Sequence, residues 1–205
     1  MANGLVNKNS ITDFSEFGFY EYLLMVHPDD VVNAQLTAEK LAFSEKYKTA
    51  VALKTKPHIT VANFLAREAM EDTLIRWIQR ACSLQHNFTV TLNNYSGLPK
   101  HTIYWRVQDH LPFKDLCDSL KVIQQYLHMN ECPDMKLSGY RPHLTLARRL
   151  PEHIYFNAML DYSQRVFHAS FEVNELVLLR RRHQFDKCEQ VNVFGLKRAM
   201  IETEE

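Results

Sequence analysis

Two copies of one short segment hold the residues best suited to chemistry. Residues 56–62 read Lys-Pro-His-Ile-Thr-Val-Ala, and residues 141–147 read Arg-Pro-His-Leu-Thr-Leu-Ala. Four of the seven positions are identical, and the other three keep a basic or an aliphatic side chain. The copies lie 85 residues apart and a helical pattern follows each of them, which suggests two related halves.

Each copy has the pattern of a β-strand. Because side chains alternate between the two faces of a strand, we expect His58 and Thr60 to share one face, as His143 and Thr145 do in the second copy. The aliphatic residues between them would anchor the other face in a core. Pairing the two strands around a pseudo-two-fold axis would then present two imidazoles and two hydroxyls to one cleft.

This set of side chains is suited to phosphodiester chemistry. Two imidazoles with ordinary pKa values near ~6.5 can divide the work close to neutral pH, one as a neutral base and one as a charged acid. The hydroxyls of Thr60 and Thr145 can donate hydrogen bonds to the non-bridging phosphate oxygens. We therefore take His58 and His143 as the candidate catalytic pair and the two threonines as candidate phosphate ligands.

Glycine usage excludes the other common way to hold a phosphate. The chain has only five glycines, and no two of them are separated by a single residue. It therefore lacks both the dinucleotide-binding fingerprint and the glycine-rich phosphate loop. The ten histidines contain no His-x-x-x-His or His-Glu-x-x-His spacing, so we expect neither a metal site nor a cofactor.

A structural interpretation stands beside the catalytic one. His58 and His143 could be partly buried histidines on strands, and Thr60 and Thr145 could be present only because threonine favours strands. The repeated seven-residue frame argues for catalysis. A third His-x-Ser pair, at residues 168–170, lacks that frame, and we interpret it as a chance match on a solvent face.

Basic residues near the motifs have two interpretations each. Arg148 lies five residues after His143, so strict alternation places it on the opposite face unless a bulge intervenes. Lys56 and Arg141 flank the prolines and are either solvated or close to the substrate. We keep Arg148 and Arg141 as candidate substrate-binding residues. Of the three arginines at residues 180–182, we expect one to reach the cleft.

An aromatic pair on a later strand also has two interpretations. Tyr104 and Trp105 could provide a platform for base stacking. Because they are consecutive on a strand, one of them must face the core.

The remaining patterns predict a mixed α+β or α/β domain with strands and four helical segments. Strands are expected near residues 20–27, 56–64, 88–92, 102–107, 143–150, 167–173, 176–182 and 191–196, with helices between several of them, a turn at 96–99 and a loop at 133–139. We expect a flexible arm over residues 1–18, one two-lobed domain over 19–198 and a tail over 199–205.

Composition excludes several classes of protein. Lys and Arg total 24, as do Asp and Glu, so no overall field draws the chain to duplex nucleic acid or to an anionic membrane. The four cysteines form no Cys-x-x-Cys pair and are expected as reduced thiols. No apolar run approaches the ~20 residues of a membrane span, and we expect a cytoplasmic protein, monomeric and without a membrane partner.

The two motifs, their spacing and their flanking strands resemble the 2H phosphoesterase superfamily, whose name refers to paired His-x-Thr/Ser-x motifs. Within it the chain looks most like the 2′-5′ RNA ligase-like, or cyclic phosphodiesterase, branch. Residues 141–148, 175–181 and 193–196 carry this second likeness, and the resemblance covers roughly residues 20–197.

The resemblance implies a bilobal, duplicated α+β fold, with antiparallel-rich sheets lining a central cleft and helices outside. It implies hydrolysis of 2′,3′-cyclic phosphate ends of RNA or small nucleotides to 2′-phosphates, or the related making and breaking of 2′-5′ linkages, and hence a role in RNA processing. By the same resemblance, His58 matches the proton donor to the departing 3′ oxygen, and His143 matches the proton acceptor from water.

Two rival hypotheses come from other functional classes. One is a module of the same fold that binds nucleotides or RNA ends with little or no turnover. The other is a metal-bound hydrolase that uses the scattered histidines, which metal analysis of the purified protein would test.

Overall fold

The computed structural model describes residues 18–183 and 186–198. Except for Gly18, the predicted arm (1–18) and tail (199–205) lie outside these residues. The elements are β1 (Phe19–Val26), α1 (Asp30–Tyr47), η2 (Ala50–Lys54), β2 (Ile59–Arg67), η3 (Glu68–Met70), α2 (Glu71–Cys82), β3 (Phe88–Leu98), β4 (Thr102–Val107), α3 (Leu111–Met129), β5 (Lys136–Leu137), η4 (Ser138–Tyr140), β6 (His143–Arg148), α4 (Glu152–Tyr162), β7 (His168–Val173), β8 (Glu175–Arg181) and β9 (Glu189–Gly195).

The strands form an antiparallel sheet in the order β7-β3-β4-β6-β2-β1-β8-β9, with the short β5 paired to β2. Along this order the described strands divide into two groups, since β2 and β6 pair through one residue pair, Ile59 with Leu144. We call β2, β1, β8 and β9 the first lobe, and β7, β3, β4 and β6 the second lobe. The α+β class expected from the sequence is confirmed.

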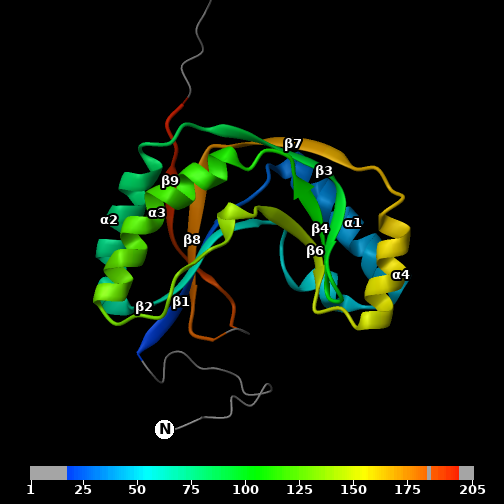
Figure 1. The fold of residues 1–205 in the computed structure, drawn as a ribbon, viewed down its shortest axis with the longest axis horizontal. Helices are drawn as coiled ribbons and strands as arrows, with labels where there is room; N and C mark the ends of the chain where they lie inside the picture. Colours follow the sequence, from blue (N-terminus) through cyan, green and yellow to red (C-terminus); the bar gives the residue numbers. More distant parts are fainter. Residues whose placement is uncertain (1–17, 184–185, 199–205) are drawn as a thin grey trace, which may run out of the picture.

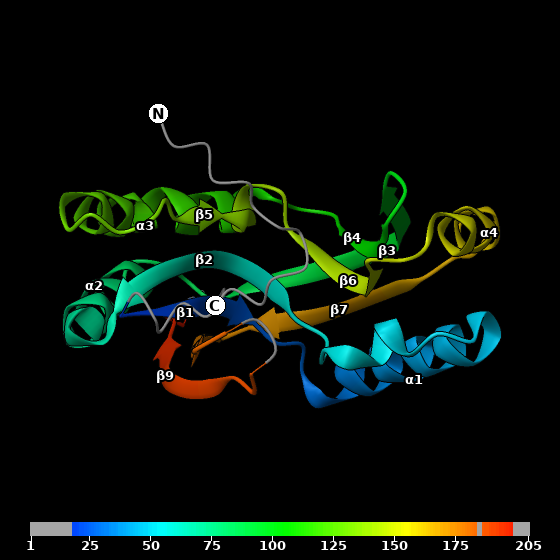
Figure 2. The same cartoon turned by 90° about the horizontal axis from the view of Figure 1, so that it is seen from below.

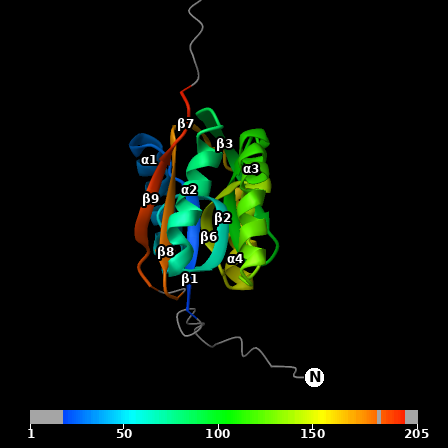
Figure 3. The ribbon, with the colours of Figure 1, turned by 90° about the vertical axis from the view of Figure 1, so that its left-hand side faces the viewer.

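The helices lie at the two ends of this arrangement. Figures 1 and 2 show α2 and α3 at the first lobe and α1 and α4 at the second, with the strands between them. Figure 3, seen from the first lobe, shows α2 between α3 on one side and β8 and β9 on the other. The molecule is therefore built from two similar halves that meet at β2 and β6.

A second connection joins the lobes. Strand β7 ends at Val173 and β8 begins at Glu175, so one residue, Asn174, separates a strand of the second lobe from a strand of the first. Strands β7 and β8 are distant in the sheet order yet continuous in the chain. The sheet must therefore curve, and its curvature carries β2 and β6 away from a flat arrangement.

Local sequence explains where the helices begin and which side they bury. Asp29 accepts a hydrogen bond from the backbone N–H of Val32 (2.8 Å) and so caps α1. Leu36 and Phe43 on the same stripe are completely buried. Each such side chain contributes about 1.5–3 kcal/mol through the removal of its apolar surface from water.

The turn predicted at residues 96–99 is wrong. Residues 96–98 continue β3, and the turn follows at 99–101. Gly97 is in the strand because α4 packs closely there: an added Cβ would lie 2.5 Å from the hydroxyl of Tyr155. The glycine that indicated a turn is instead required by packing.

The predicted loop and the cysteines are seen directly in the structure. The predicted loop at 133–139 contains β5 and most of η4. Cys82, Cys117, Cys132 and Cys188 all carry free thiols. None of the helices over 18–183 and 186–198 is both long and apolar enough to cross a membrane.

Candidate active site

The two motifs meet where the lobes join. Ile59 and Leu144 are antiparallel partners. Extended by one residue to either side, that register places His58 opposite Thr145 and Thr60 opposite His143. All four side chains therefore project from one face of the sheet, which we call the site face, while Ile59 and Leu144 are fully buried on the other.

The register also sets how the two imidazoles lie relative to each other. Extended by one residue to either side of Ile59 and Leu144, it makes His58 and His143 diagonal neighbours across the strand pair. Each imidazole has the threonine of the other motif directly opposite it. An anion between the two rings would therefore be close to both hydroxyls as well.

Both imidazoles are held in the same tautomer. Nδ1 of His58 is 2.8 Å from the carbonyl oxygen of Lys56, and Nδ1 of His143 is 3.0 Å from that of Arg141. Because a carbonyl oxygen can only accept, Nδ1 must donate in each case. Nε2 of each ring is thus left for chemistry, as a lone pair in the neutral ring or as an N–H in the charged one.

The repeated basic residue and proline now have a structural explanation. The residue two before each histidine supplies the carbonyl oxygen that orients the ring, with Pro57 or Pro142 between them. The side chains of Lys56 and Arg141 are exposed. The carbonyl oxygen of Arg141 therefore orients the His143 ring, and its guanidinium stays a candidate substrate ligand.

A β-bulge brings Arg148 to the site face. On β4, Tyr104 pairs with Thr145, but the next residue, Ile103, pairs with Ala147, so Leu146 is an extra residue in β6. The extra residue reverses the alternation, and Arg148, opposite Thr102, projects from the same face as Thr145. The bulge left open by the sequence is present.

The first lobe has a β-bulge at the equivalent position. Met25 pairs with Thr60 and Leu24 pairs with Ala62, so Val61 is the extra residue in β2. Asn63 then occupies the place in the first motif that Arg148 occupies in the second, five residues after the histidine. The two halves share their backbone geometry but differ in charge at this position.

Asn63 belongs to a hydrogen-bonded group on the first lobe. Its amide nitrogen donates to one carboxylate oxygen of Glu21 (2.7 Å), and Nε of Arg181 donates to the other (2.6 Å). Glu21 is only 9% exposed, so its charge needs such partners, and Asn63 and Arg181 supply them. Arg148 lies within electrostatic reach of this group, since the charges of Arg181 and Glu21 both act on its pKa.

Of the three consecutive arginines, the structure therefore places Arg181 near the site. Arg180 instead pairs with Glu68 (3.0 Å) and Glu71 (2.9 Å), next to α2. Arg181 is therefore the arginine of residues 180–182 that belongs to the group containing Glu21 and Asn63.

The surroundings of His58 disfavour its charged form. Burial lowers the pKa of His58 from 6.5 to about 4, despite the opposing effect of the hydrogen bond to Lys56. The positive charges of His27, Lys40 and Arg148 lower it further. In the protein without substrate, His58 is therefore neutral at pH 7.

Lys40 is a site residue that the sequence interpretation missed. It lies on α1, is 2% exposed, and donates hydrogen bonds to the carbonyl oxygens of Ala52 (3.2 Å) and Thr55 (2.9 Å). Desolvation, with the nearby charge of Arg148, lowers the pKa of Lys40 to about 8. Its position between Leu36 and Phe43 on the buried stripe was the available signal.

The two aromatic residues on β4 separate as expected. Trp105 is completely buried. Tyr104 lies on the site face, where its ring centroid is 5.0 Å from that of His143 at an angle of 57°. Tyr104 is thus the aromatic residue available to a ligand.

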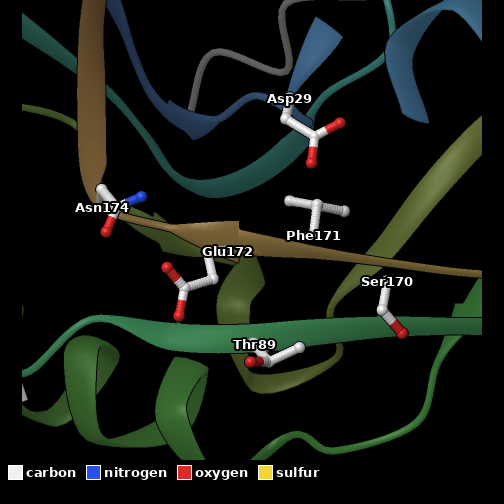
Figure 4. Close-up of a pocket in the computed structure, with 6 residues that line it drawn as sticks. All are labelled: Asp29, Thr89, Ser170, Phe171, Glu172 and Asn174. Carbon is white, nitrogen blue, oxygen red and sulfur yellow. The ribbon is translucent and has the colours of Figure 1, made fainter. Parts of the chain in front are cut away.

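A pocket elsewhere in the structure contains none of the four motif residues. It is lined by Asp29, Thr89, Ser170, Phe171, Glu172 and Asn174 (Figure 4). Its two carboxylates and lack of a basic side chain make it unsuitable for a phosphate. Over residues 18–183 and 186–198, no group of three or more His, Cys, Asp or Glu side chains is arranged to hold a metal ion.

Comparison with known families identifies one match. The model of the 2′-5′ RNA ligase superfamily matches residues 28–184, which include both motifs. No curated protein matches the chain in sequence.

Solved structures share the fold at low sequence identity. The crystal structure of E. coli LigT complexed with 3′-AMP aligns with a TM-score of 0.59 and 14% identity, covering 88% of this chain and 99% of that one. TT0787 of Thermus thermophilus aligns with a TM-score of 0.55 and 16% identity, covering 87% and 98%. A crystal structure described as a phosphoesterase gives 0.57 and 15%, covering 87% and 98%. At these identities the likeness concerns the fold.

Proposed function

This chain belongs to the 2′-5′ RNA ligase superfamily, and from that membership we propose that it is a metal-independent phosphodiesterase that hydrolyses 2′,3′-cyclic phosphate ends of RNA or nucleotides. The observation that carries the proposal is the matched pair of imidazoles. His58 and His143 project from one face, each with Nδ1 bound to a carbonyl oxygen and Nε2 left over. Each also faces the threonine of the opposite motif.

The reaction that this arrangement supports is a displacement by water at phosphorus. His143 takes a proton from water through Nε2 as the water oxygen forms a bond to phosphorus. The bond between phosphorus and the 3′ oxygen breaks, and His58 gives that oxygen a proton through Nε2. The product is a 2′-phosphate with a free 3′ hydroxyl. The division of roles follows the family resemblance, and each proton transfer contributes about 10² to 10⁴ in rate.

Thr60, Thr145 and Arg148 would bind the phosphate. The hydroxyls can donate to its non-bridging oxygens, and the guanidinium of Arg148 can compensate the negative charge that builds up on them. Arg148 projects from the same face as Thr145, which lies opposite His58. The anion would thus be held between the rings by groups from both lobes.

The substrate itself would have to prepare His58 as an acid. His58 is neutral in the empty site because burial lowers its pKa to about 4. A bound phosphodiester places a negative charge beside the ring, and a neighbouring negative charge raises the pKa of an imidazole. Protonation of His58 would therefore be coupled to substrate binding.

Relatives of the same fold support a nucleotide as ligand. Crystal structures of E. coli LigT are described as complexes with 3′-AMP, with phosphate, with ATP and with NADP+. Each of these ligands carries a phosphoryl group, which is the group that the paired imidazoles and threonines of this chain are arranged to receive.

The decisive experiment measures turnover of nucleoside 2′,3′-cyclic phosphates and of oligoribonucleotides ending in a cyclic phosphate. We expect 2′-phosphate products, activity that persists in excess chelator, and a loss of about 10² to 10⁴ for His58→Ala and for His143→Ala. His153→Ala, at an exposed position on α4, is the matched control and should keep full activity. Full turnover by His143→Ala would refute the proposal.

One observation favours the alternative of a binding module. A histidine that is neutral at pH 7 is a poor proton donor, and His58 is neutral in the empty protein. Calorimetry with 2′- and 3′-nucleotides, run beside the turnover assay, separates the two functions. Binding without product from any cyclic or 2′-5′-linked substrate would establish the module.

A further inference from the structure

We propose that His27 is a third histidine of the site, which binds the phosphoryl group beside His58 through its Nε2. This inference rests on the proposed function insofar as it places an anion at the two motifs. It assigns a role to one of the eight histidines outside the repeated frame.

His27 lies directly across the sheet from His58. Val26, the last residue of β1, pairs with Ile59, and one step along that antiparallel register His27 faces His58. The side chain of Val26 is fully buried, so that of His27 projects to the opposite side, which is the site face. The two ring centroids are 6.4 Å apart with an angle of 62° between the planes.

The ring of His27 is oriented in the same way as the two motif rings. Its Nδ1 is 3.2 Å from the carbonyl oxygen of Pro57, so Nδ1 donates and Nε2 is left over. Successive carbonyls of one segment thus orient two neighbouring imidazoles, Lys56 for His58 and Pro57 for His27. The same backbone segment therefore fixes the orientation of both rings.

The pseudo-two-fold relation gives His27 a counterpart. On the other lobe, Arg106 pairs with His143 across β4 and β6, as His27 faces His58 across β1 and β2. Nε of Arg106 donates to the carbonyl oxygen of Asn93 (3.1 Å), and the side chain is exposed on the site face. Each motif histidine therefore has a basic side chain beside it in the same place.

Electrostatics agree with a shared ligand. A positive charge on His27 lowers the pKa of His58, which shows that the two rings are within electrostatic reach. An anion between them would reduce this repulsion by interacting with both. Hydrogen bonds of about 2.9 Å from each Nε2 to oxygens of one phosphate are compatible with the ring separation. His27 is exposed, so an anion can approach it.

The contrasting interpretation is that His27 only fastens the end of β1 to Pro57. The two interpretations differ in which ring nitrogen matters. His27→Asn keeps an N–H donor at the place of Nδ1 and lacks Nε2, so it preserves the bond to Pro57 and removes the proposed ligand. His27→Arg supplies the cation that Arg106 supplies on the other lobe.

The test measures binding of inorganic phosphate and of a nucleoside 2′-monophosphate by calorimetry. A charged hydrogen bond is worth about a tenfold change in affinity or more, so His27→Asn and His27→Ala should bind at least about tenfold more weakly. His27→Arg should restore most of the affinity, and His153→Ala should bind as the wild type does. Affinity within twofold of wild type in folded His27→Asn would overturn the proposal.

The test of His27 can fail or succeed independently of the proposed phosphodiesterase activity. If the wild type hydrolyses no cyclic phosphate, the phosphodiesterase proposal fails, yet the phosphate affinities still decide the role of His27. If the wild type is active, His27→Asn should raise KM at least as much as it lowers affinity. Unchanged KM with lowered kcat would show that His27 acts in another way and would also overturn the proposal.

Discussion

The buried ammonium of Lys40 donates a hydrogen bond to the carbonyl oxygen of Thr55 at 2.9 Å. Thr55 immediately precedes the first motif, so α1 is fastened to the segment whose next carbonyl, that of Lys56, orients His58. Lys40 is only 2% exposed, so its ammonium is largely removed from water. This desolvation disfavours the charged form and lowers the pKa of Lys40 from 10.5 to about 8.

This burial predicts a specific dependence of stability on pH. Between pH 8 and 10.5 the unfolded chain keeps a proton on Lys40 that the folded protein has released, so the free energy of unfolding rises with pH in this window. The gain from this group approaches ~3 kcal/mol. Denaturant titrations at several pH values should show it as a difference between wild type and Lys40→Met.

The comparison uses differences because tyrosines and cysteines also titrate in the same window. Their contributions are common to both proteins and cancel. Lys121→Met, which removes an exposed lysine paired with Asp118 (2.6 Å), is the matched control and should not show the gain as a difference from wild type. Parallel curves for wild type and Lys40→Met would show that Lys40 keeps its ordinary pKa in the folded protein.

The lowered pKa of His58 predicts how stability changes at acidic pH. Its pKa is lowered to about 4, so between pH 6.5 and 4 the unfolded chain binds a proton that the folded protein does not. Stability is therefore lost as the pH falls through this window, by ~3 kcal/mol at its lower end. NMR titration of the His58 ring should give a midpoint near 4, and the stability of His58→Gln should fall less on acidification.

Addition of phosphate provides the functional half of this test. A bound anion should raise the midpoint of His58 toward neutrality, because it favours the charged imidazole. A midpoint near 6.5 without ligand would contradict the effect of burial on His58. A midpoint that stays near 4 with saturating phosphate would contradict the coupling of protonation to binding.

The sequence predicted the motif residues because their pattern is local. His58, Thr60, His143 and Thr145 stand in a repeated frame, and alternation on a strand places each pair on one face. The approximate positions of most strands also followed from periodicity. The pairing of Ile59 with Leu144, which brings the pairs together, is consistent with the predicted pseudo-two-fold relation.

Features that depend on another part of the chain could not be predicted. The face of Arg148 depends on the extra residue Leu146, which only the pairing with β4 reveals. In the sequence, Gly97 resembles a glycine in a turn. In the structure, a glycine is needed there because the Tyr155 hydroxyl on α4 leaves no space for a side chain. No pattern indicates Lys40 as part of the site, because a buried lysine is rare and its acceptors lie in a different segment.

Gly97 allows a test of that packing argument. Gly97→Ala places a Cβ 2.5 Å from the Tyr155 hydroxyl and 2.9 Å from the sulfur of Met159. We expect a loss of about 1–3 kcal/mol in the free energy of unfolding. Gly195→Ala, where no atom lies within 4 Å of an added Cβ, is the control and should change stability little. Equal stability of the two variants would contradict the close approach of α4 to β3.

Arg148 should matter for the anion and not for the fold. We expect Arg148→Gln to weaken phosphate binding by about tenfold or more, since it removes a charged donor from the site face. Arg76→Gln, which changes the same charge at an exposed position on α2, is the control. Thermal unfolding should be similar for both variants. Unchanged phosphate affinity in Arg148→Gln would place its side chain on the surface without a role in binding.

The threonines can be tested without disturbing the strands. Valine has nearly the shape of threonine and is also enriched in strands, so Thr60→Val and Thr145→Val change only a hydroxyl to a methyl group. If these hydroxyls bind the phosphate more strongly as charge builds up on its oxygens, kcat should fall by about 10- to 100-fold in each variant. Thr91→Val, which removes a hydroxyl bonded to Ser170 (3.1 Å), is the control. A rise in KM with unchanged kcat would instead mean that the hydroxyls bind substrate and transition state equally.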